Sequence, residues 1–402
     1  MRPPMASTHE GDCGAAHCDT PRASARIPPH TSPHTSPRTS PHTSPRESPR
    51  ESALTSERAA RDADGWRISA NGLRAAVSLS LLLLLCAAGA AQAATATRIS
   101  RIALTVADVG RSERFYRDGL GFKQVSTQLL DDPAYAQLYG VPHARIHVVI
   151  MQLGDEQIEF DQFDRRGQAY PRDSRSEDRW FQHFAIVVGD MDRAYAQLHK
   201  LHPIAISRGG PQTLPPATGS VSAYKFRDPD GHPLELIHFP AGQGRSRWHD
   251  ADTTGRVFLG IDHSAIGVAD SARSLAFYTH LLGLTQAYRS LNEGPTQVAL
   301  DGAFNATVRI TGLRPPDAHG AGVELLDYRA PDDGRSSVLP AHSNDIADTR
   351  LRFDVDDLDA ISNALLDADV PFVSPRRVAL PDGRQAAIIV RDPDGHAIEL
   401  VQ

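Results

Sequence analysis

The chain has 402 residues, enough for two or three domains, and a formal net charge of −7. Residues 94–402 contain 32 Lys and Arg against 41 Asp and Glu, a net charge of −9 that argues against a nucleic-acid partner. All three cysteines, Cys13, Cys18 and Cys86, precede residue 94, so the rest of the chain has neither a thiol nucleophile nor a cysteine metal site.

The first segment, residues 1–73, is expected to be a disordered leader. Its repeat "PHTSPRTSPHTSPRESPRES", from Pro33, offers no apolar side chain to bury, so the entropy of ordering it is not offset. Alternatively, this stretch lies upstream of the true translation start.

Residues 74–93 are predicted to be a signal peptide. Arg74 precedes an uncharged run, and the small residues Ala91 and Ala93 suit cleavage before Ala94. This interpretation predicts an exported, periplasmic protein. The run from Ala75 to Thr97 is also just long enough to span a bilayer, so an uncleaved inner-membrane anchor is the alternative, and the only expected contact with a membrane.

The remainder is predicted to repeat one unit four times, each a strand, a helix and about three further strands. The four units begin at "RIALTVADVGRSERFYRDGLGF" from Arg101, "HFAIVVGDMDRAYAQLHKL" from His183, "HSAIGVADSARSLAFYTHLLGL" from His263 and "RLRFDVDDLDAISNALLDA" from Arg350. An alternating apolar strand comes first, and an Asp such as Asp108 or Asp270 is placed to cap the helix. Each unit ends in a strand with a lone glutamate: Glu159, Glu235, Glu324 and Glu399.

Two near-identical phrases precede the last strands of the second and fourth units. "RDPDGHPLEL" starts at Arg227 and "RDPDGHAIEL" at Arg391. Asp, Pro and Gly there are explained by a tight turn. Tyr116 and Tyr278, in the "FY" pairs of two helices, are expected to pack against the core and not to act as catalysts.

The βαβββ plan, "FYRDGLGF" and "DPDGHxxEL" resemble the vicinal oxygen chelate superfamily, which includes glyoxalase I, extradiol dioxygenases and bleomycin-binding proteins. The resemblance implies an α+β fold, with two tandem vicinal-oxygen-chelate domains of two units each at 98–240 and 258–402, joined by a linker at 241–257. It also implies that two units form a cup around a divalent metal held by one residue of each first strand and one glutamate of each last strand.

Carried onto this chain, the resemblance offers Arg101, His183, His263 and Arg350 from the first strands. Arginine is always protonated and cannot ligate a metal. If neighbouring units pair, each cup has one His and one Arg. If units two and three pair instead, one cup holds a full set for a single Zn, Ni, Fe or Mn ion: His183, Glu235, His263 and Glu324. We expect this second pairing, which places the two arginines together beside Glu159 and Glu399. Neighbour pairing, with the glutamates in structural roles and no metal, is the alternative.

The ligand set favours an exported, metal-dependent lyase or isomerase of the glyoxalase type, acting on a small oxygen-bearing substrate, with Glu235 and Glu324 as candidates for proton transfer. An extradiol-type dioxygenase is one alternative. A metal-free protein that binds or sequesters a small molecule, as in antibiotic resistance, is the other. The protein is expected to be a monomer.

Overall fold

The computed structural model describes residues 95–252, 255–317, 319–336, 342–381, 383 and 385–402. The predicted leader and signal peptide lie outside these residues. Among the described residues, no helix is both long enough and apolar enough to cross a membrane.

The four predicted units are present, and the α+β prediction is confirmed. The first unit contains β1 (Ala96–Thr105), α2 (Val109–Leu120), β2 (Lys123–Leu130), α3 (Pro133–Tyr139), β3 (Ile146–Leu153) and β4 (Glu156–Phe163). The second contains β5 (Gln182–Val188), α4 (Met191–His199), β6 (Ile204–Ala205), β7 (Gln212–Thr213), the 3₁₀ turn η1 (Pro216–Thr218), β8 (Ser222–Arg227) and β9 (Pro233–His238).

The other two units follow a short helix, α5 (Ser246–Asp252). The third unit contains β10 (Phe258–Gly267), α6 (Ser271–Ala276), the π-helical turn η2 (Phe277–Leu281), β11 (Thr285–Asn292), α7 (Pro295–Asp301), β12 (Thr307–Arg314) and β13 (Gly322–Ala330). The fourth contains β14 (Thr349–Val355), α8 (Leu358–Asp367), β15 (Val378–Ala379), β16 (Ala386–Arg391) and β17 (Ala397–Val401).

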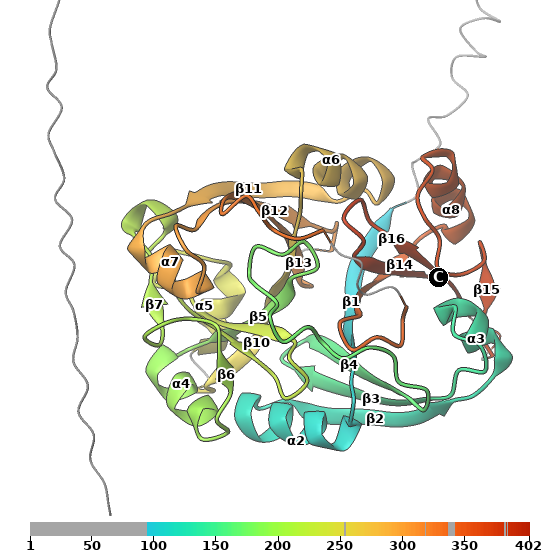
Figure 1. Ribbon diagram of the computed structural model, residues 1–402, viewed down its shortest axis with the longest axis horizontal. Coiled ribbons are helices and arrows are strands. Elements are labelled where there is room, and N and C mark those ends of the chain that lie inside the picture. Colours follow the sequence, from blue (N-terminus) through green and yellow to red (C-terminus); the bar gives the residue numbers. More distant parts are fainter. Residues whose placement is uncertain (1–94, 253–254, 318, 337–341, 382, 384) are drawn as a thin grey trace, which may run out of the picture. The chain divides into compact units, whose positions relative to one another are not determined.

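The units pair as the arginine positions predicted. One sheet has the order β15-β16-β17-β14-β1-β4-β3-β2, and so joins the fourth unit to the first. The other runs β11-β12-β13-β10-β5-β9-β8-β6, with β7 beside β8, and joins the third to the second. Figure 1 shows the same arrangement, with β1 beside the red strands of the last unit and the green β5 beside the yellow β10. Each cup therefore takes one unit from each half of the chain.

The helices begin where the sequence places a capping carboxylate. The side chain of Asp108 accepts a hydrogen bond from the backbone N–H of Arg111, and Asp270 accepts two in the same way at the start of α6. The carboxylates satisfy amide groups that have no partner within the helix. Gly121 ends α2 with φ of 73°, a left-handed conformation that glycine adopts without steric cost. These caps fix where each helix leaves the sheet.

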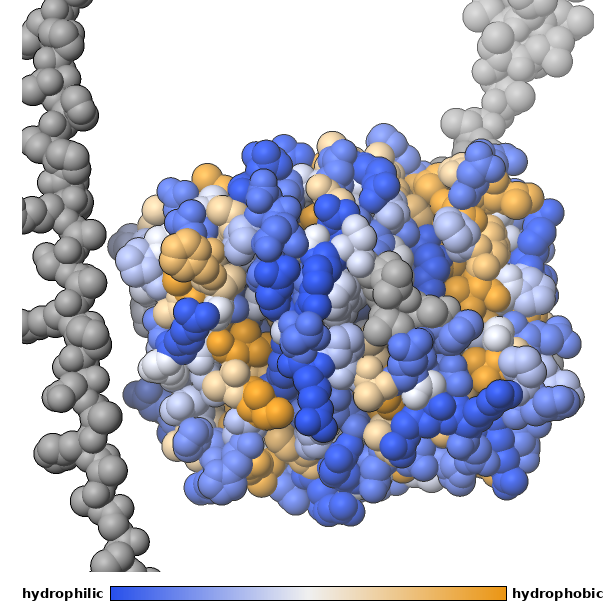
Figure 2. All heavy atoms as spheres, viewed as in Figure 1, coloured by the Kyte–Doolittle hydropathy of each residue, from blue (hydrophilic) through white to orange (hydrophobic). Residues whose placement is uncertain are grey.

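The two predicted packing tyrosines are fully buried in the main core. The hydroxyl of Tyr116 donates to Asp228 Oδ2 at 3.2 Å, and Tyr278 donates to Asp392 Oδ2 at 3.0 Å. The first Asp of each "DPDG" turn therefore does more than shape the turn, because it also binds the helix of the preceding unit, which lies on the other sheet. On the face seen in Figure 2, hydrophilic residues predominate and hydrophobic ones occur in separate groups.

Candidate functional site

The two histidines of the second and third units lie on adjacent central strands. In the antiparallel pair β5–β10, His183 faces Ala265 and His263 faces Ala185. Residues two apart on a strand lie on the same face of the sheet, so both imidazoles enter the same cup. Their ring centroids are 6.1 Å apart.

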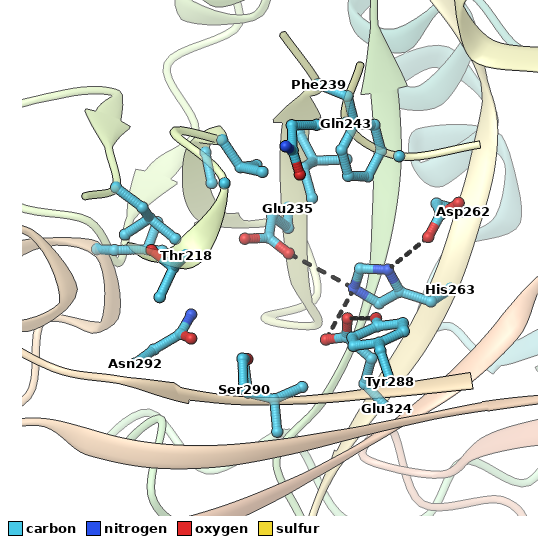
Figure 3. A pocket seen from close by; sticks show the side chains of 18 of the residues that line it. Thr218, Glu235, Phe239, Gln243, Asp262, His263, Tyr288, Ser290, Asn292 and Glu324 are labelled. Carbon is cyan, nitrogen blue, oxygen red and sulfur yellow. Dashed lines mark hydrogen bonds and ion pairs between the residues drawn. The ribbon is translucent and has the colours of Figure 1, made fainter. Parts of the chain in front are cut away.

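The glutamates reach the histidines from the flanking strands β9 and β13. His183 Nε2 lies 3.1 Å from Glu235 Oε2, and His263 Nε2 lies 3.8 Å from the same oxygen. Glu324 Oε2 is 3.3 Å from His263 Nε2. Figure 3 shows Glu235 and Glu324 approaching His263 from two sides.

Three of the four predicted ligands form a compact group. One ligand atom from each of His183, Glu235 and His263 lies within 4.8 Å of the other two, and all three residues are buried. Glu324 contacts His263 but stands outside this group, because its Oε1 accepts a very short hydrogen bond from the hydroxyl of Tyr288.

A carboxylate behind His263 fixes the orientation of that ring. Asp262 Oδ2 lies 3.1 Å from His263 Nδ1. Asp262 in turn accepts hydrogen bonds from Trp248 Nε1 at 2.7 Å and from Arg245 Nε at 3.1 Å. Consecutive strand residues normally point to opposite faces, but β10 has a bulge between Ile261 and His263, which places Asp262 beside its neighbour. Burial would raise the pKa of Asp262, but the hydrogen bond from His263 and the charges of Arg314 and Arg245 keep it low.

The arrangement around His263 Nε2 shows that these residues suit a bound cation. When neutral His263 donates its Nδ1–H to Asp262, the lone pair of Nε2 points at Glu235 and Glu324, and within the described residues this buried nitrogen has no hydrogen-bond partner. Burial alone would raise the pKa of Glu235, but the hydrogen bond from His183 and the charge of Lys225 lower it to about 2. A lone pair surrounded by carboxylates is stabilised by a divalent ion, for which neutral imidazole and carboxylate are suitable ligands.

The group lies in the wall of a cavity of about 530 Å³. Much of the rest of the wall is apolar, including Leu214, Val221, Ile237, Phe239, Leu300 and Ile310. A buried ion pair also borders the cavity: Lys225 Nζ lies 2.7 Å from Asp301 Oδ1. The volume and lining suit a small, largely apolar molecule with a few polar groups.

The other cup contains ion pairs where this one has histidines. Arg101 Nη1 lies 3.0 Å from Glu159 Oε2, and Arg350 Nε lies 3.8 Å from Glu399 Oε2. Arg350 is fully buried and also binds Asp348 and, through a very short contact, Asp161. Arg101 and Arg350 each lie near a glutamate, as predicted from the sequence.

Sequence reasoning missed the residues that support the site: Asp262, Tyr288, Lys225, Asp301 and Arg245. The charged Lys225 between the aromatic residues Tyr224 and Phe226 could have indicated a buried charge. Arg245 was overlooked because it falls in the predicted linker 241–257, which instead contains α5 and contributes Gln243, Gly244 and Arg245 to the cavity wall.

Comparisons with known proteins agree with this fold. The model of the Glyoxalase/Bleomycin resistance protein/Dioxygenase superfamily matches residues 98–236 and 260–400. The crystal structure of glyoxalase I from Zea mays is similar over 76% of this chain and 92% of that chain, with 17% identity and a TM-score of 0.51. A putative dioxygenase from Bacillus subtilis matches over 76% of this chain and 85% of that chain, with 16% identity and a TM-score of 0.46. No curated protein sequence matches the chain significantly. The chain therefore belongs to the Glyoxalase/Bleomycin resistance protein/Dioxygenase superfamily.

Proposed function

We propose that the protein is a metal-dependent lyase or isomerase of the glyoxalase type, acting on a small oxygen-bearing molecule. The observation that carries the proposal is the convergence of His183, Glu235 and His263, with Glu324 beside them, in the wall of a largely apolar cavity. His183, Glu235 and His263 would hold one divalent ion, with Glu324 beside it. Such an ion supplies Lewis-acid polarisation of a substrate oxygen.

The residues around the ion have different roles in the proposed reaction. His183 and Glu235 are buried and hydrogen-bonded to each other, which suits a fixed ligand pair. Glu324 borders the cavity, and its Oε2 lies 3.3 Å from His263 Nε2. A carboxylate placed there can take a proton from a carbon next to a carbonyl and return it to the neighbouring carbon. The apolar wall excludes water from the reacting carbon.

The test is solvent exchange. Purified protein loaded with Zn²⁺, Ni²⁺ or Mn²⁺ is incubated with hydroxyacetone and related α-hydroxyketones in D₂O and followed by proton NMR. We expect metal-dependent deuterium incorporation beside the carbonyl that is lost in Glu324→Gln. Exchange that persists after chelation would contradict the proposal.

A dioxygenase is the second candidate, because the compact group has two histidines and one glutamate, the ligand types of many non-haem Fe(II) oxygenases. Oxygen uptake by the Fe²⁺-loaded protein with catechol, measured with an oxygen electrode, would favour it. Binding of small molecules without any bound metal would instead favour a sequestration protein. We further propose, from the sequence of residues 74–93, that the protein works outside the cytoplasm. We also propose that it is a monomer.

A further inference from the structure

We propose that Tyr288 is a positioning residue that holds Glu324 outside the compact group of His183, Glu235 and His263, and so makes Glu324 the carboxylate that is free to carry a proton. The proposal rests on the metal site proposed above. Glu235 and Glu324 occupy equivalent strands, yet only Glu235 belongs to the compact group. The difference between them is the hydroxyl of Tyr288, which donates to Glu324 Oε1.

A row of three residues across the sheet makes this contact possible. Tyr288 on β11 faces Gly312 on β12, and Gly312 faces Glu324 on β13. Tyr288 and Glu324 are thus two strands apart, about 9–10 Å between backbones at normal strand spacing. The side chain of Tyr288 must cross the middle strand to reach the carboxylate.

Gly312 leaves the space for that crossing. A Cβ atom at this position would overlap Cε1 and Cζ of the Tyr288 ring. Gly312 lies within a strand and is not among the glycines with positive φ, so backbone conformation does not explain it. The Tyr288 ring lies over Gly312, where any larger residue would displace it, so the glycine defines the position of the ring.

The arginine cup provides an internal comparison. The equivalent row on β4, β3 and β2 is Glu159, Ile150 and Ser126, with a register shift at the same point of the outer strand. Ile150 fills the space that Gly312 leaves open, and Ser126 is too short to reach the glutamate. The Tyr–Gly–Glu row therefore occurs in the cup that has histidines and not in its counterpart with arginines.

The geometry has a consequence for Glu324. One of its oxygens is held by Tyr288 and the other faces His263, so the tyrosine limits how closely this carboxylate can approach an ion bound by the other three residues. Among the described residues, the ion pairs of Glu235 are with the two histidines, while Lys225, which faces it across the sheet, pairs with Asp301. Tyr288 thereby keeps Glu324, and not Glu235, off the ion and free to carry a proton.

A double-mutant cycle on the full-length protein tests the proposal, with Co²⁺ as the probe. Affinity is measured by calorimetry and ligand number by the visible absorption of bound Co²⁺. In the wild type, Glu324→Gln should change affinity less than about 3-fold, because Tyr288 already holds that carboxylate away. Tyr288→Phe should raise affinity, and adding Glu324→Gln to Tyr288→Phe should then lower it about 10-fold or more, as expected for loss of a ligand.

The absorption spectrum should also change on Tyr288→Phe, because Glu324 joins the ion, and revert in the double variant. Gly312→Ala should reproduce Tyr288→Phe by displacing the ring. Tyr195→Phe, on α4 outside the cavity lining, is the matched control and should leave affinity unchanged. Equal effects of Glu324→Gln with and without Tyr288 would overturn the positioning role while leaving the metal site intact. Failure of the wild type to bind Co²⁺ would overturn the site itself.

Discussion

His183 and His263 occupy the positions that Arg350 and Arg101 occupy in the other sheet, as the strand registers show. The sequence could predict that these two histidines are the candidate nitrogen ligands, because an arginine cannot replace an imidazole as a ligand. Asp262 and Tyr288 could not. Asp262 turns towards its neighbour only because of a bulge in β10, and Tyr288 reaches Glu324 only because of the glycine between them. Neither the bulge nor the role of this glycine can be recognised from the order of apolar and polar residues in the sequence.

Arg350 stabilises the arginine cup from within. It is fully buried, pairs with Asp161 and Asp348, and lies over the ring of Tyr139 at 4.8 Å. Burial alone would lower its pKa, but the charges of Asp161 and Asp348 hold it well above the usual value. Arg350→Leu leaves buried carboxylates without their cation, and we expect a loss of about 3–5 kcal/mol in the free energy of unfolding.

Urea denaturation followed by circular dichroism measures this loss. The control is Arg98→Leu, which removes a side chain that is 54% exposed from its surface pair with Asp354. Exposed pairs contribute about 0–1 kcal/mol. Similar losses for the two variants would show that Arg350 is not a structural cation.

At the scale of elements, the sequence predicted the helix after the first strand of each unit, because capping and amphipathic spacing are local properties. The short helices α3, α5 and α7 were not predicted. The sequence predicted the "DPDG" stretches only as turns. Asp228 also binds Tyr116 and His232, and these contacts join the turn to a helix on the other sheet and to the ring that follows. Turn propensity depends on neighbouring residues only, so it cannot predict such long-range contacts.

The turn around His232 should make stability depend on pH. His232 Nδ1 lies 2.9 Å from Asp228 Oδ2 and Nε2 lies 2.7 Å from the carbonyl oxygen of Ile346, so both nitrogens face acceptors. Burial lowers the pKa of His232, but the charge of Asp228 outweighs it and raises the pKa above 6.5. A raised pKa contributes stability that is complete below about 6.5 and is lost as the pH rises through the folded-state value.

His232→Gln should therefore lower the free energy of unfolding more at about pH 5.5 than at about pH 9. Urea titrations at the two pH values measure the difference. His147→Gln, an exposed histidine beside Asp164, is the control and should show little dependence. A larger loss of unfolding free energy at about pH 9 would contradict the conclusion that His232 is charged in the folded protein.

At the scale of the whole molecule, the decisive feature is that sheets form between the second and third units and between the first and fourth. The ligand pattern predicted this pairing because only one arrangement collects both histidines. The segment between the halves was predicted less well. It was expected to be a linker, but it contains the helix α5, from which Trp248 Nε1 donates a hydrogen bond to Asp262, a contact that composition does not reveal.

The central claim is one divalent ion per chain, held where the second and third units meet. Metal content of protein purified without chelator, measured by inductively coupled plasma mass spectrometry, tests it most directly. We expect one ion per chain in the wild type, none in His183→Ala or His263→Ala, and one in Glu159→Gln and Glu399→Gln, since those glutamates face arginines. A wild type without metal, or loss of the ion on changing Glu159 or Glu399, would contradict the claim.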